Sequence, residues 1–239
     1  MIPPLAVVFD LDGTLIDSRG DIVAAANYAL SRSGRSALPA QVIVRYVGDG
    51  ARSLLARASK VPEDSQELDQ LLESFLAYYT AHPIDFTRWM DGALEALDAL
   101  SNMPEMAIAL CTNKPRVTTD AVLRSLGVEA LFKVIIAGGD LPHKKPSREP
   151  LLHIARMLSV PPSAMVMVGD GPQDVESAHA AGMRSVAVEG GFCAMERVRA
   201  ARPDVVLRNL RELASMIQRW CDSTARVTPK RVSPGSPDV

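Results

Sequence analysis

Two aspartates spaced two residues apart, Asp10 and Asp12, are the side chains of this chain best placed to do chemistry. They follow the short apolar run 5–9, which predicts a buried strand. Because side chains at positions i and i+2 of an extended chain point to the same side, both carboxylates should share one patch at the strand's C-terminal end. Two carboxylates that close repel each other, and a divalent cation or a shared proton relieves the repulsion. The alternative is a strand that leaves through an Asx-type turn at Asp12-Gly13.

A hydroxyl and an amide follow a second predicted strand. The apolar run 106–111 ends in Thr112 and Asn113. Neutral donors at the end of a strand can hold a phosphoryl oxygen. Either residue, just ahead of Pro115, would also make a good helix N-terminus, which is the alternative interpretation. The position after a strand, downstream of the two aspartates, favours binding of a phosphoryl group.

Two adjacent lysines, Lys144 and Lys145, follow a third predicted strand at 133–137. A lysine supplies a point charge for a phosphate group and for a crowded carboxylate cluster. The residue types alone do not decide which of the two lysines faces such a site.

A second pair of carboxylates, Asp170 and Asp174, lies where the predicted strand 164–168 gives way to a helical pattern. Two carboxylates four residues apart at such a junction can both face one cation, and acidic groups also suit a helix N-terminus. Simple N-capping by each aspartate is the alternative.

These four segments, each directly after an apolar strand, resemble in their order the four motifs of the haloacid dehalogenase-like hydrolases, most of which are phosphatases. The resemblance runs from Leu5 to about Ile217. It implies that Asp10 attacks phosphorus and forms an aspartyl-phosphate, and that Asp12 is the general acid and base. The family's third motif has a lysine directly before a proline, which selects Lys145 as the third catalytic residue. The phosphate-binding residues implied by the resemblance are Gly13, Thr14, Thr112 and Asn113.

The same resemblance implies a Mg²⁺ cofactor held by Asp10, Asp12 and Asp170, with Asp12 contributing its main-chain carbonyl. Asp174 is expected behind the ion, where it would hold a metal-bound water. Gly171 departs from the family pattern, because the family commonly has serine there. One hydroxyl contact expected from the family is therefore missing.

From residue 101 onward, predicted strands alternate with helical patterns, which argues for a parallel sheet with helices on both faces. We therefore expect an α/β, Rossmann-like core built from residues 1–17 and 91–221. Ligands of such sheets bind outside the carboxyl ends of the strands, where all four motifs lie. Residues 222–239 are rich in Pro and Ser without periodicity and are expected to form a disordered tail. The predicted strands are 5–9, 106–111, 133–137, 164–168, 184–188 and 204–207.

Residues 18–90 interrupt this pattern with apolar positions at helical spacing. By the resemblance they form a small α-helical cap domain, inserted between the first motif and the second strand. A lid at this place would expel water from the site, and its loops would choose the substrate. An unrelated helical domain is the alternative.

Within this insert, Gly48, Gly50 and Arg52 are the candidates for substrate specificity. Paired glycines that open a helix offer backbone N–H groups, and an arginine can bind a carboxylate through two hydrogen bonds. The stretch resembles the Val-Gly-x-Gly-Ala segment in the caps of bacterial phosphoglycolate phosphatases, which implies 2-phosphoglycolate as the substrate. A solvated helix face is the alternative for Arg52.

The amino-acid composition limits which binding partners and which cellular compartment we expect for this protein. The 47% hydrophobic and 23% charged residues are typical of a globular protein, and the net charge of −2 offers no basic surface for nucleic acid or an anionic membrane. No apolar run approaches the ~20 residues that span a bilayer, and the first strand begins too close to Met1 for a signal peptide. The three cysteines suit a reducing cytosol. We expect a cytoplasmic protein, with monomer and homodimer both open.

Taken together, the residues and the resemblance predict a Mg²⁺-dependent hydrolase of a small phosphomonoester. A sugar-phosphate phosphatase, a pyrophosphatase and a phosphosugar mutase of the same capped type stay open. Asp12 argues against a haloacid dehalogenase and a phosphonoacetaldehyde hydrolase, which lack a carboxylate at this position. A phospho-aspartate receiver domain also uses aspartate, metal, threonine and lysine, but it has neither the role of Asp12 nor a helical cap.

Overall fold

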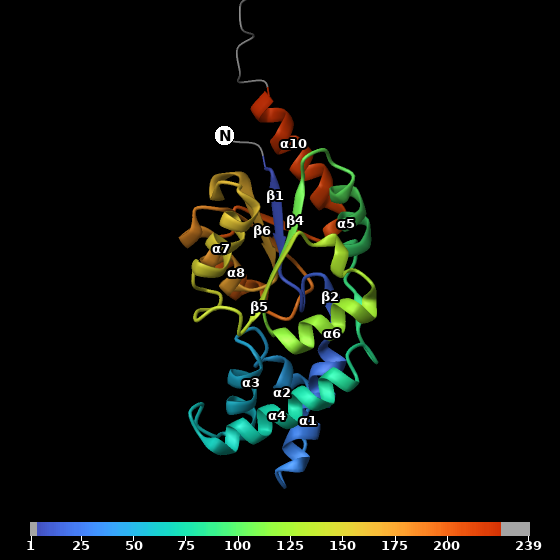
Figure 1. Cartoon of the computed structure of the whole chain (residues 1–239), viewed down its shortest axis with the longest axis vertical. Helices are drawn as coiled ribbons and strands as arrows, with labels where there is room; N and C mark the ends of the chain where they lie inside the picture. Colours follow the sequence, from blue (N-terminus) through green and yellow to red (C-terminus); the bar gives the residue numbers. More distant parts are fainter. Residues whose placement is uncertain (1–3, 226–239) are drawn as a thin grey trace, which may run out of the picture.

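The computed structural model describes residues 4–225 and contains a six-stranded sheet in which all neighbouring strands are parallel (Figure 1). The strands are β1 (Ala6–Phe9), β4 (Ala107–Pro115), β5 (Val134–Gly138), β6 (Met165–Gly169), β7 (Arg184–Val188) and β8 (Val205–Leu207). Their order across the sheet is β5-β4-β1-β6-β7-β8. The predicted α/β, Rossmann-like sheet is confirmed. The largest difference is β4, which continues four residues past its expected end at Cys111.

Helices cover both faces of this sheet, as the alternating pattern predicted (Figure 1). They are α5 (Ala93–Ser101), α6 (Arg116–Leu126), α7 (Glu149–Leu158), α8 (Pro172–Ala181), α9 (Met195–Ala200) and α10 (Leu213–Ala225), with short 3₁₀ turns at Glu129–Leu131, Pro162–Ala164 and Leu210–Glu212. Residues of α5, α6 and α10 share one core with the sheet, whereas residues of α7 and α8 share the other.

The central strand β1 is buried because its side chains alternate between these two cores. Val7 and Phe9 join the core that includes α5, α6 and α10, and Ala6 and Val8 join the core that includes α7 and α8. All four side chains are 0% exposed. β1 pairs with β4 on one side and β6 on the other, so that Phe9 aligns with Leu110 and Val168. The residues that follow β1, β4 and β6 therefore meet at one edge of the sheet.

A group of four helices lies beyond this edge, in the lower part of Figure 1. The helices are α1 (Arg19–Arg32), α2 (Ala40–Val44), α3 (Ala51–Ser59) and α4 (Gln66–Ala81). Their apolar faces pack together through residues such as Ile22, Leu55 and Leu71. A two-stranded antiparallel ribbon of β2 (Ile16–Asp17) and β3 (Arg88–Trp89) brings the entry to and the exit from this helical group side by side.

The C-terminal part of the chain differs from the sequence-based expectation at one point. Helix α10 continues to Ala225, four residues past the boundary expected at Cys221. The rest of the predicted disordered tail, residues 226–239, lies outside the described residues. Among residues 4–225, no helix is long and apolar enough to cross a membrane.

Candidate active site

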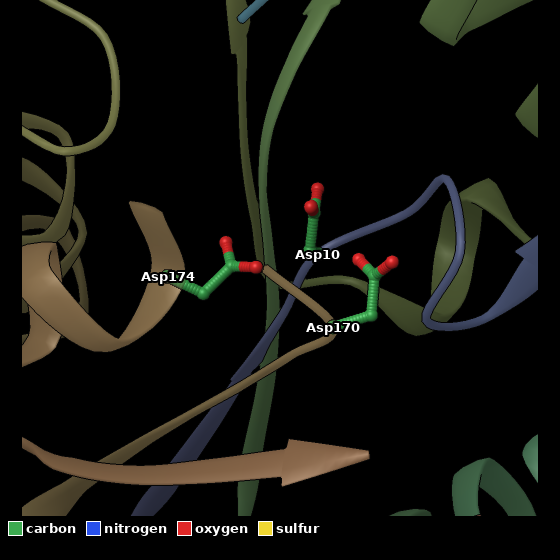
Figure 2. A group of neighbouring side chains, drawn as sticks. All are labelled: Asp10, Asp170 and Asp174. Atoms are coloured by element: carbon green, nitrogen blue, oxygen red, sulfur yellow. The ribbon is translucent and has the colours of Figure 1, made fainter. Parts of the chain in front are cut away.

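Three buried carboxylates meet at the carboxyl edge of the sheet (Figure 2). Asp10 directly follows β1, Asp170 directly follows β6, and Asp174 lies in the first turn of α8. One oxygen from each carboxylate lies within 4.8 Å of the others, and the residues are only 6%, 4% and 1% exposed. The sequence predicted that these three residues would come together, and the topology brings them together from segments more than 150 residues apart.

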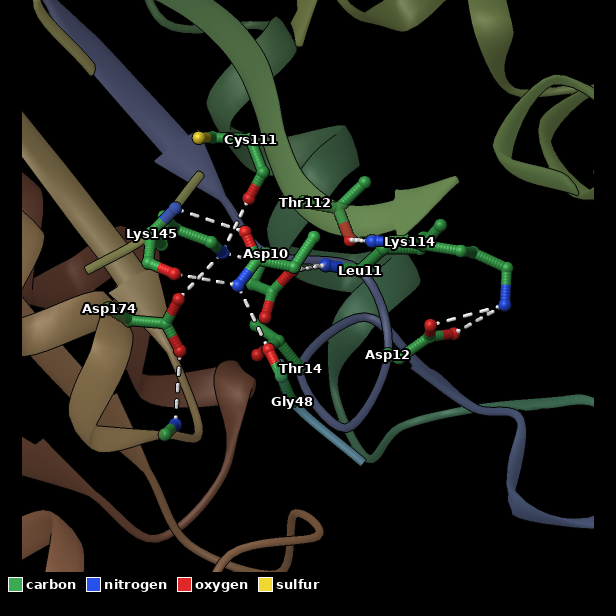
Figure 3. A network of polar contacts seen from close by, with 12 residues as sticks. Asp10, Leu11, Asp12, Thr14, Gly48, Cys111, Thr112, Lys114, Lys145 and Asp174 are labelled. Carbon is green, nitrogen blue, oxygen red and sulfur yellow. Dashed lines mark hydrogen bonds and ion pairs between the residues drawn. The ribbon is translucent and has the colours of Figure 1, made fainter. Parts of the chain in front are cut away.

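Among the described residues, one ammonium group pairs with carboxylates of this cluster, and it comes from the loop after β5. The Nζ atom of Lys145 lies 2.6 Å from Asp174 Oδ1 and 3.1 Å from Asp10 Oδ1, and it donates to the carbonyl of Cys111 at 2.6 Å (Figure 3). Its side chain is 1% exposed. The neighbouring Lys144 is exposed and contacts the carbonyl of Asp49 instead. The structure therefore selects Lys145, as the position before proline implied.

Burial dominates the electrostatics of the cluster. It raises the pKa of Asp170 to about 8, and the charges of Asp174 and Asp10 add to the effect. Burial also raises the pKa of Asp10 to about 6, although the Lys145 charge opposes this shift. Burial alone would lower the pKa of Lys145, but the charges of Asp10 and Asp174 raise it above its ordinary value.

This donor set fits a small divalent cation. Three carboxylates face one ammonium group, so the cluster holds more negative than positive charge, and hard cations prefer carboxylate oxygens. Both oxygens of Asp174 have protein partners, namely Lys145 Nζ and, at 3.0 Å, the N–H of Gly171. Asp10 Oδ2 accepts no hydrogen bond from the described residues. Both oxygens of Asp170 also have partners, namely the N–H of Phe192 at 2.6 Å and Thr14 Oγ1 at 3.4 Å. The hydrogen bonds therefore leave Asp10 Oδ2 free, and the roles of Asp170 as a direct ligand and Asp174 behind it stay predictions of the resemblance.

The carboxylate of Asp12 lines the same cavity as Asp10 but is not part of the cluster of Asp10, Asp170 and Asp174. Both Asp12 oxygens lie 3.1 Å from Lys114 Nζ, and Ser18 Oγ donates to Asp12 Oδ1 at 2.6 Å (Figure 3). The reason is local: β1 ends at Phe9, so the alternation of an extended strand does not reach position 12. Only the main chain of Asp12 is left as a possible metal ligand, as the resemblance implied.

Gly13 and Thr14 support Asp170 and do not line the cavity, and their expected contact with phosphate stays a prediction. Gly13 has a φ of +84°, and a Cβ there would lie 2.3 Å from Asp170 Oδ2, so glycine lets the loop pass against that carboxylate. Thr14 Oγ1 donates to Asp170 Oδ1 at 3.4 Å.

Asn113 also has a different task from the predicted one. Its amide nitrogen donates to the carbonyls of Gly48 and Lys145, both at 2.9 Å, and its Oδ1 accepts from the N–H of Lys145 at 3.0 Å. Both amide hydrogens are used, so Asn113 fixes the Lys145 loop and is not a phosphate donor in this geometry. Thr112 lines the cavity, and its Oγ1 accepts from the N–H of Lys114, which leaves the hydroxyl proton for a ligand.

A cavity of about 870 Å³ opens above the cluster. Asp10, Asp12, Thr112 and Asp170 line its floor, and residues 44–51 of the helical group line the opposite side. Gly48 and Gly50 are among them, and their contact with substrate stays a prediction.

Arg52 points away from this cavity, which corrects the expectation that it binds substrate. Its guanidinium donates to the carbonyl of Glu63 at 2.6 Å and pairs with Asp69 at 2.5 Å. Three other arginines, Arg45, Arg57 and Arg197, line the cavity instead. Arg57 pairs with Asp49, whereas neither Arg45 nor Arg197 has an ion pair with any residue that the structure describes. The side chains of Arg45 and Arg197 are exposed, and their residue type alone did not identify them. For Arg45, its place just ahead of the segment with Gly48 and Gly50 was a readable signal.

The sequence reasoning assigned no role in the site to Lys114 or Tyr79. Tyr79 accepts from Lys114 Nζ at 2.6 Å, and burial raises the pKa of its phenol to about 12. Burial alone would lower the pKa of Lys114, but the charge of Asp12 raises it above its ordinary value. Lys114 directly follows the Thr112-Asn113 pair, so its place at the end of a strand was a readable signal.

A parallel α/β sheet with a carboxylate cluster and a buried lysine at its carboxyl edge defines a Rossmann-like hydrolase. The chain belongs to the haloacid dehalogenase-like hydrolases, whose family pattern it matches over residues 7–188. It is 38% identical over 220 residues to a phosphoglycolate phosphatase of Neisseria meningitidis, covering 89% of this chain and 93% of that one. It is 34% identical to a phosphoglycolate phosphatase of Chromobacterium violaceum, covering 89% and 96%.

Solved structures show the same fold. The crystal structure of a predicted phosphoglycolate phosphatase from Haemophilus somnus superimposes with a TM-score of 0.81 at 24% identity. The match covers 90% of this chain and 99% of that one. Both the sheet and the helical group therefore belong to an arrangement that occurs in other proteins.

Proposed function

We propose that this protein is a Mg²⁺-dependent phosphatase that hydrolyses a small phosphomonoester, 2-phosphoglycolate, through an aspartyl-phosphate. The observation that carries the proposal is the buried cluster of Asp10, Asp170 and Asp174 with Lys145, at the floor of a cavity large enough for a small ligand. The relatives described as phosphoglycolate phosphatases support the choice of substrate, because they match nearly the whole chain.

The nucleophile in this mechanism is Asp10 Oδ2. Its partner oxygen, Oδ1, is held by the N–H of Leu11 at 2.7 Å and by Lys145, which fixes the direction of the free oxygen. Oδ2 attacks phosphorus in line, and the bond from phosphorus to the leaving oxygen breaks. Thr112 donates its hydroxyl proton to a phosphoryl oxygen. Since Lys145 Nζ already contacts Asp10, Asp174 and the carbonyl of Cys111, it acts by orienting Asp10 and balancing its charge.

Asp12 moves the proton in both steps. As an acid it protonates the leaving oxygen, and as a base it then takes a proton from the water that attacks phosphorus and releases Asp10. Asp12 lines the same cavity as Asp10 and Thr112, but its carboxylate is separate from the cluster of Asp10, Asp170 and Asp174. A bound Mg²⁺, held by Asp10, Asp170 and the main chain of Asp12 with Asp174 behind, would neutralise charge on the phosphoryl group.

Residues 18–90 form the cap in this proposal, and residues 4–17 and 91–225 form the catalytic core. The cap meets the core directly above the site, where the carbonyl of Gly48 accepts from Asn113 and the carbonyl of Asp49 contacts Lys144. Arg45 of the cap and Arg197 of the core line the cavity and supply positive charge for the carboxylate of the leaving group.

The test is a panel of phosphomonoesters assayed with Mg²⁺ for kcat/KM. We expect the highest value for 2-phosphoglycolate, above those for sugar phosphates and pyrophosphate. A higher value for another ester would overturn the substrate. Conversion of a sugar phosphate to its isomer without phosphate release would indicate a mutase, and uptake of one phosphate without turnover would indicate a receiver domain.

A further inference from the structure

We propose that Lys114 and Tyr79 are positioning residues for Asp12: they hold its carboxylate in place for proton transfer and tie it to helix α4 of the cap. This inference rests on the role of Asp12 in the proposed function. It starts from the hydrogen bonds that connect Tyr79, Lys114 and Asp12, which lie outside the cluster of Asp10, Asp170 and Asp174. Lys114 Nζ lies 3.1 Å from each Asp12 oxygen and donates to Tyr79 Oη at 2.6 Å (Figure 3 shows the Lys114–Asp12 pair).

The contacts are buried, so they fix geometry more firmly than a surface pair would. The side chain of Lys114 is 3% exposed and that of Asp12 is 13% exposed, and Tyr79 as a residue is 1% exposed. Asp12 is the only carboxylate that pairs with Lys114 among residues 4–225. A buried ammonium group with one charged partner holds that partner tightly, because loss of the pair would leave an uncompensated charge.

Two side chains hold the Asp12 carboxylate, and a third holds one of them. Lys114 reaches it from β4, and Ser18 Oγ, just ahead of α1, donates to Oδ1 at 2.6 Å. Tyr79 fixes Lys114 in turn, with its hydroxyl at 2.6 Å and its ring centroid 4.0 Å from Nζ. Ser18 begins the cap and Tyr79 lies near its end, so both contacts join the cap to the proton-transfer residue. A displacement of α4 would withdraw Tyr79 from Lys114 and loosen Asp12.

The same geometry allows a competing role, because Lys114 lines the cavity and could bind the carboxylate of a substrate directly. The two roles predict different dependences of the rate on the chemistry of the leaving group. An acid matters most when the leaving oxygen is strongly basic, as in alkyl phosphates, and least for 4-nitrophenyl phosphate, whose leaving group departs without a proton. A carboxylate-binding lysine would matter only for a substrate that carries a carboxylate.

The experiment compares Lys114→Met with the natural protein on 2-phosphoglycolate, ethyl phosphate and 4-nitrophenyl phosphate, using kcat/KM because it reports the step in which the leaving group departs. We expect a loss on the order of 10- to 150-fold for both alkyl phosphates, the value of one charge-assisted contact, and less than about 3-fold for the aryl phosphate. In an Asp12→Asn background, Lys114→Met should cost little more, because residues that act through one group are not additive.

Tyr79→Phe removes only the hydroxyl and should give a smaller loss with the same dependence on the leaving group. If Lys114→Met does not fold, Tyr79→Phe is used in its place. Its matched control is Tyr78→Phe, at the neighbouring position of α4, for which we expect no loss of kcat/KM. A loss confined to 2-phosphoglycolate would overturn the proposal in favour of substrate binding. An equal loss on all three esters would make the pair structural. A natural protein without phosphatase activity would refute the proposed function itself.

Discussion

Lys145→Met is the substitution that tests the electrostatics of the cluster most sharply. Lysine and methionine have similar lengths, so the change removes the charge while it fills much of the same space. The ammonium group balances Asp10 and Asp174 at 3.1 and 2.6 Å and also donates to the carbonyl of Cys111. Without it, Asp10 and Asp174 lose their only cationic partner among the described residues.

Breaking a buried ion pair by removing one partner costs about 3–5 kcal/mol. We expect a loss of this size in the free energy of unfolding, measured by urea denaturation with a chelator at pH 8, where the carboxylates have the greatest tendency to ionise. Saturating Mg²⁺ should narrow the difference from the natural protein, because a bound cation replaces part of the missing charge. The value of kcat should fall on the order of 10²–10³-fold, because Asp10 loses the group that orients it.

Lys144→Met is the matched control, since it removes the same charge one residue earlier from an exposed position. Its free energy of unfolding should change by less than about 0.5 kcal/mol. The reasoning is refuted if the two substitutions destabilise the protein equally, or if Lys145→Met costs less than about 1 kcal/mol at pH 8.

Two further predictions concern the cavity and the metal site. Arg45→Ala should lower kcat/KM for 2-phosphoglycolate on the order of 10-fold or more and leave kcat/KM for 4-nitrophenyl phosphate unchanged. Arg52→Ala should leave kcat/KM for both substrates unchanged. The opposite result would mean that Arg52, and not Arg45, determines substrate specificity. The chelator-treated protein should lose stability as the pH rises from about 4 to about 8, because folding raises the pKa of Asp10 and Asp170 and both must ionise in the fold. Mg²⁺ should therefore raise the melting temperature more at pH 8 than at pH 5, and an equal or smaller rise at pH 8 would contradict this account.

The sequence was sufficient to predict the strands and helices whose apolar residues follow a regular pattern. Apolar runs such as 5–9 and 164–168 predicted β1 and β6 to within about a residue, because a strand buried on both faces has to be apolar throughout. Since parallel strands end at one edge, the pattern also predicted that Asp10 and Asp170 would meet. The types of these residues and the order of the strands were together enough to predict the carboxylate cluster.

The remaining contacts depend on where side chains point, which periodicity does not encode. Asp12 lines the same cavity as Asp10, but its pairing with Lys114 was not predicted, because the chain leaves the strand at Phe9. Arg52 was expected in the cavity on the strength of its motif, but Asp69, seventeen residues away, holds it outside. Contacts of this kind connect loops and helices whose relative positions are set by the whole fold.

The central claim is that Asp10 is the nucleophile, and chemical trapping tests it most directly. In Asp12→Asn, 4-nitrophenyl phosphate should still phosphorylate the protein, because its leaving group needs no proton, while hydrolysis of the aspartyl-phosphate is slowed. The reaction is stopped with denaturant, reduced with borohydride and digested, and the peptide that contains residue 10 is read by mass spectrometry. We predict homoserine at position 10, and none when Asp10→Asn is added. Phosphate on a serine or histidine, or reduction at any other aspartate, would contradict the account.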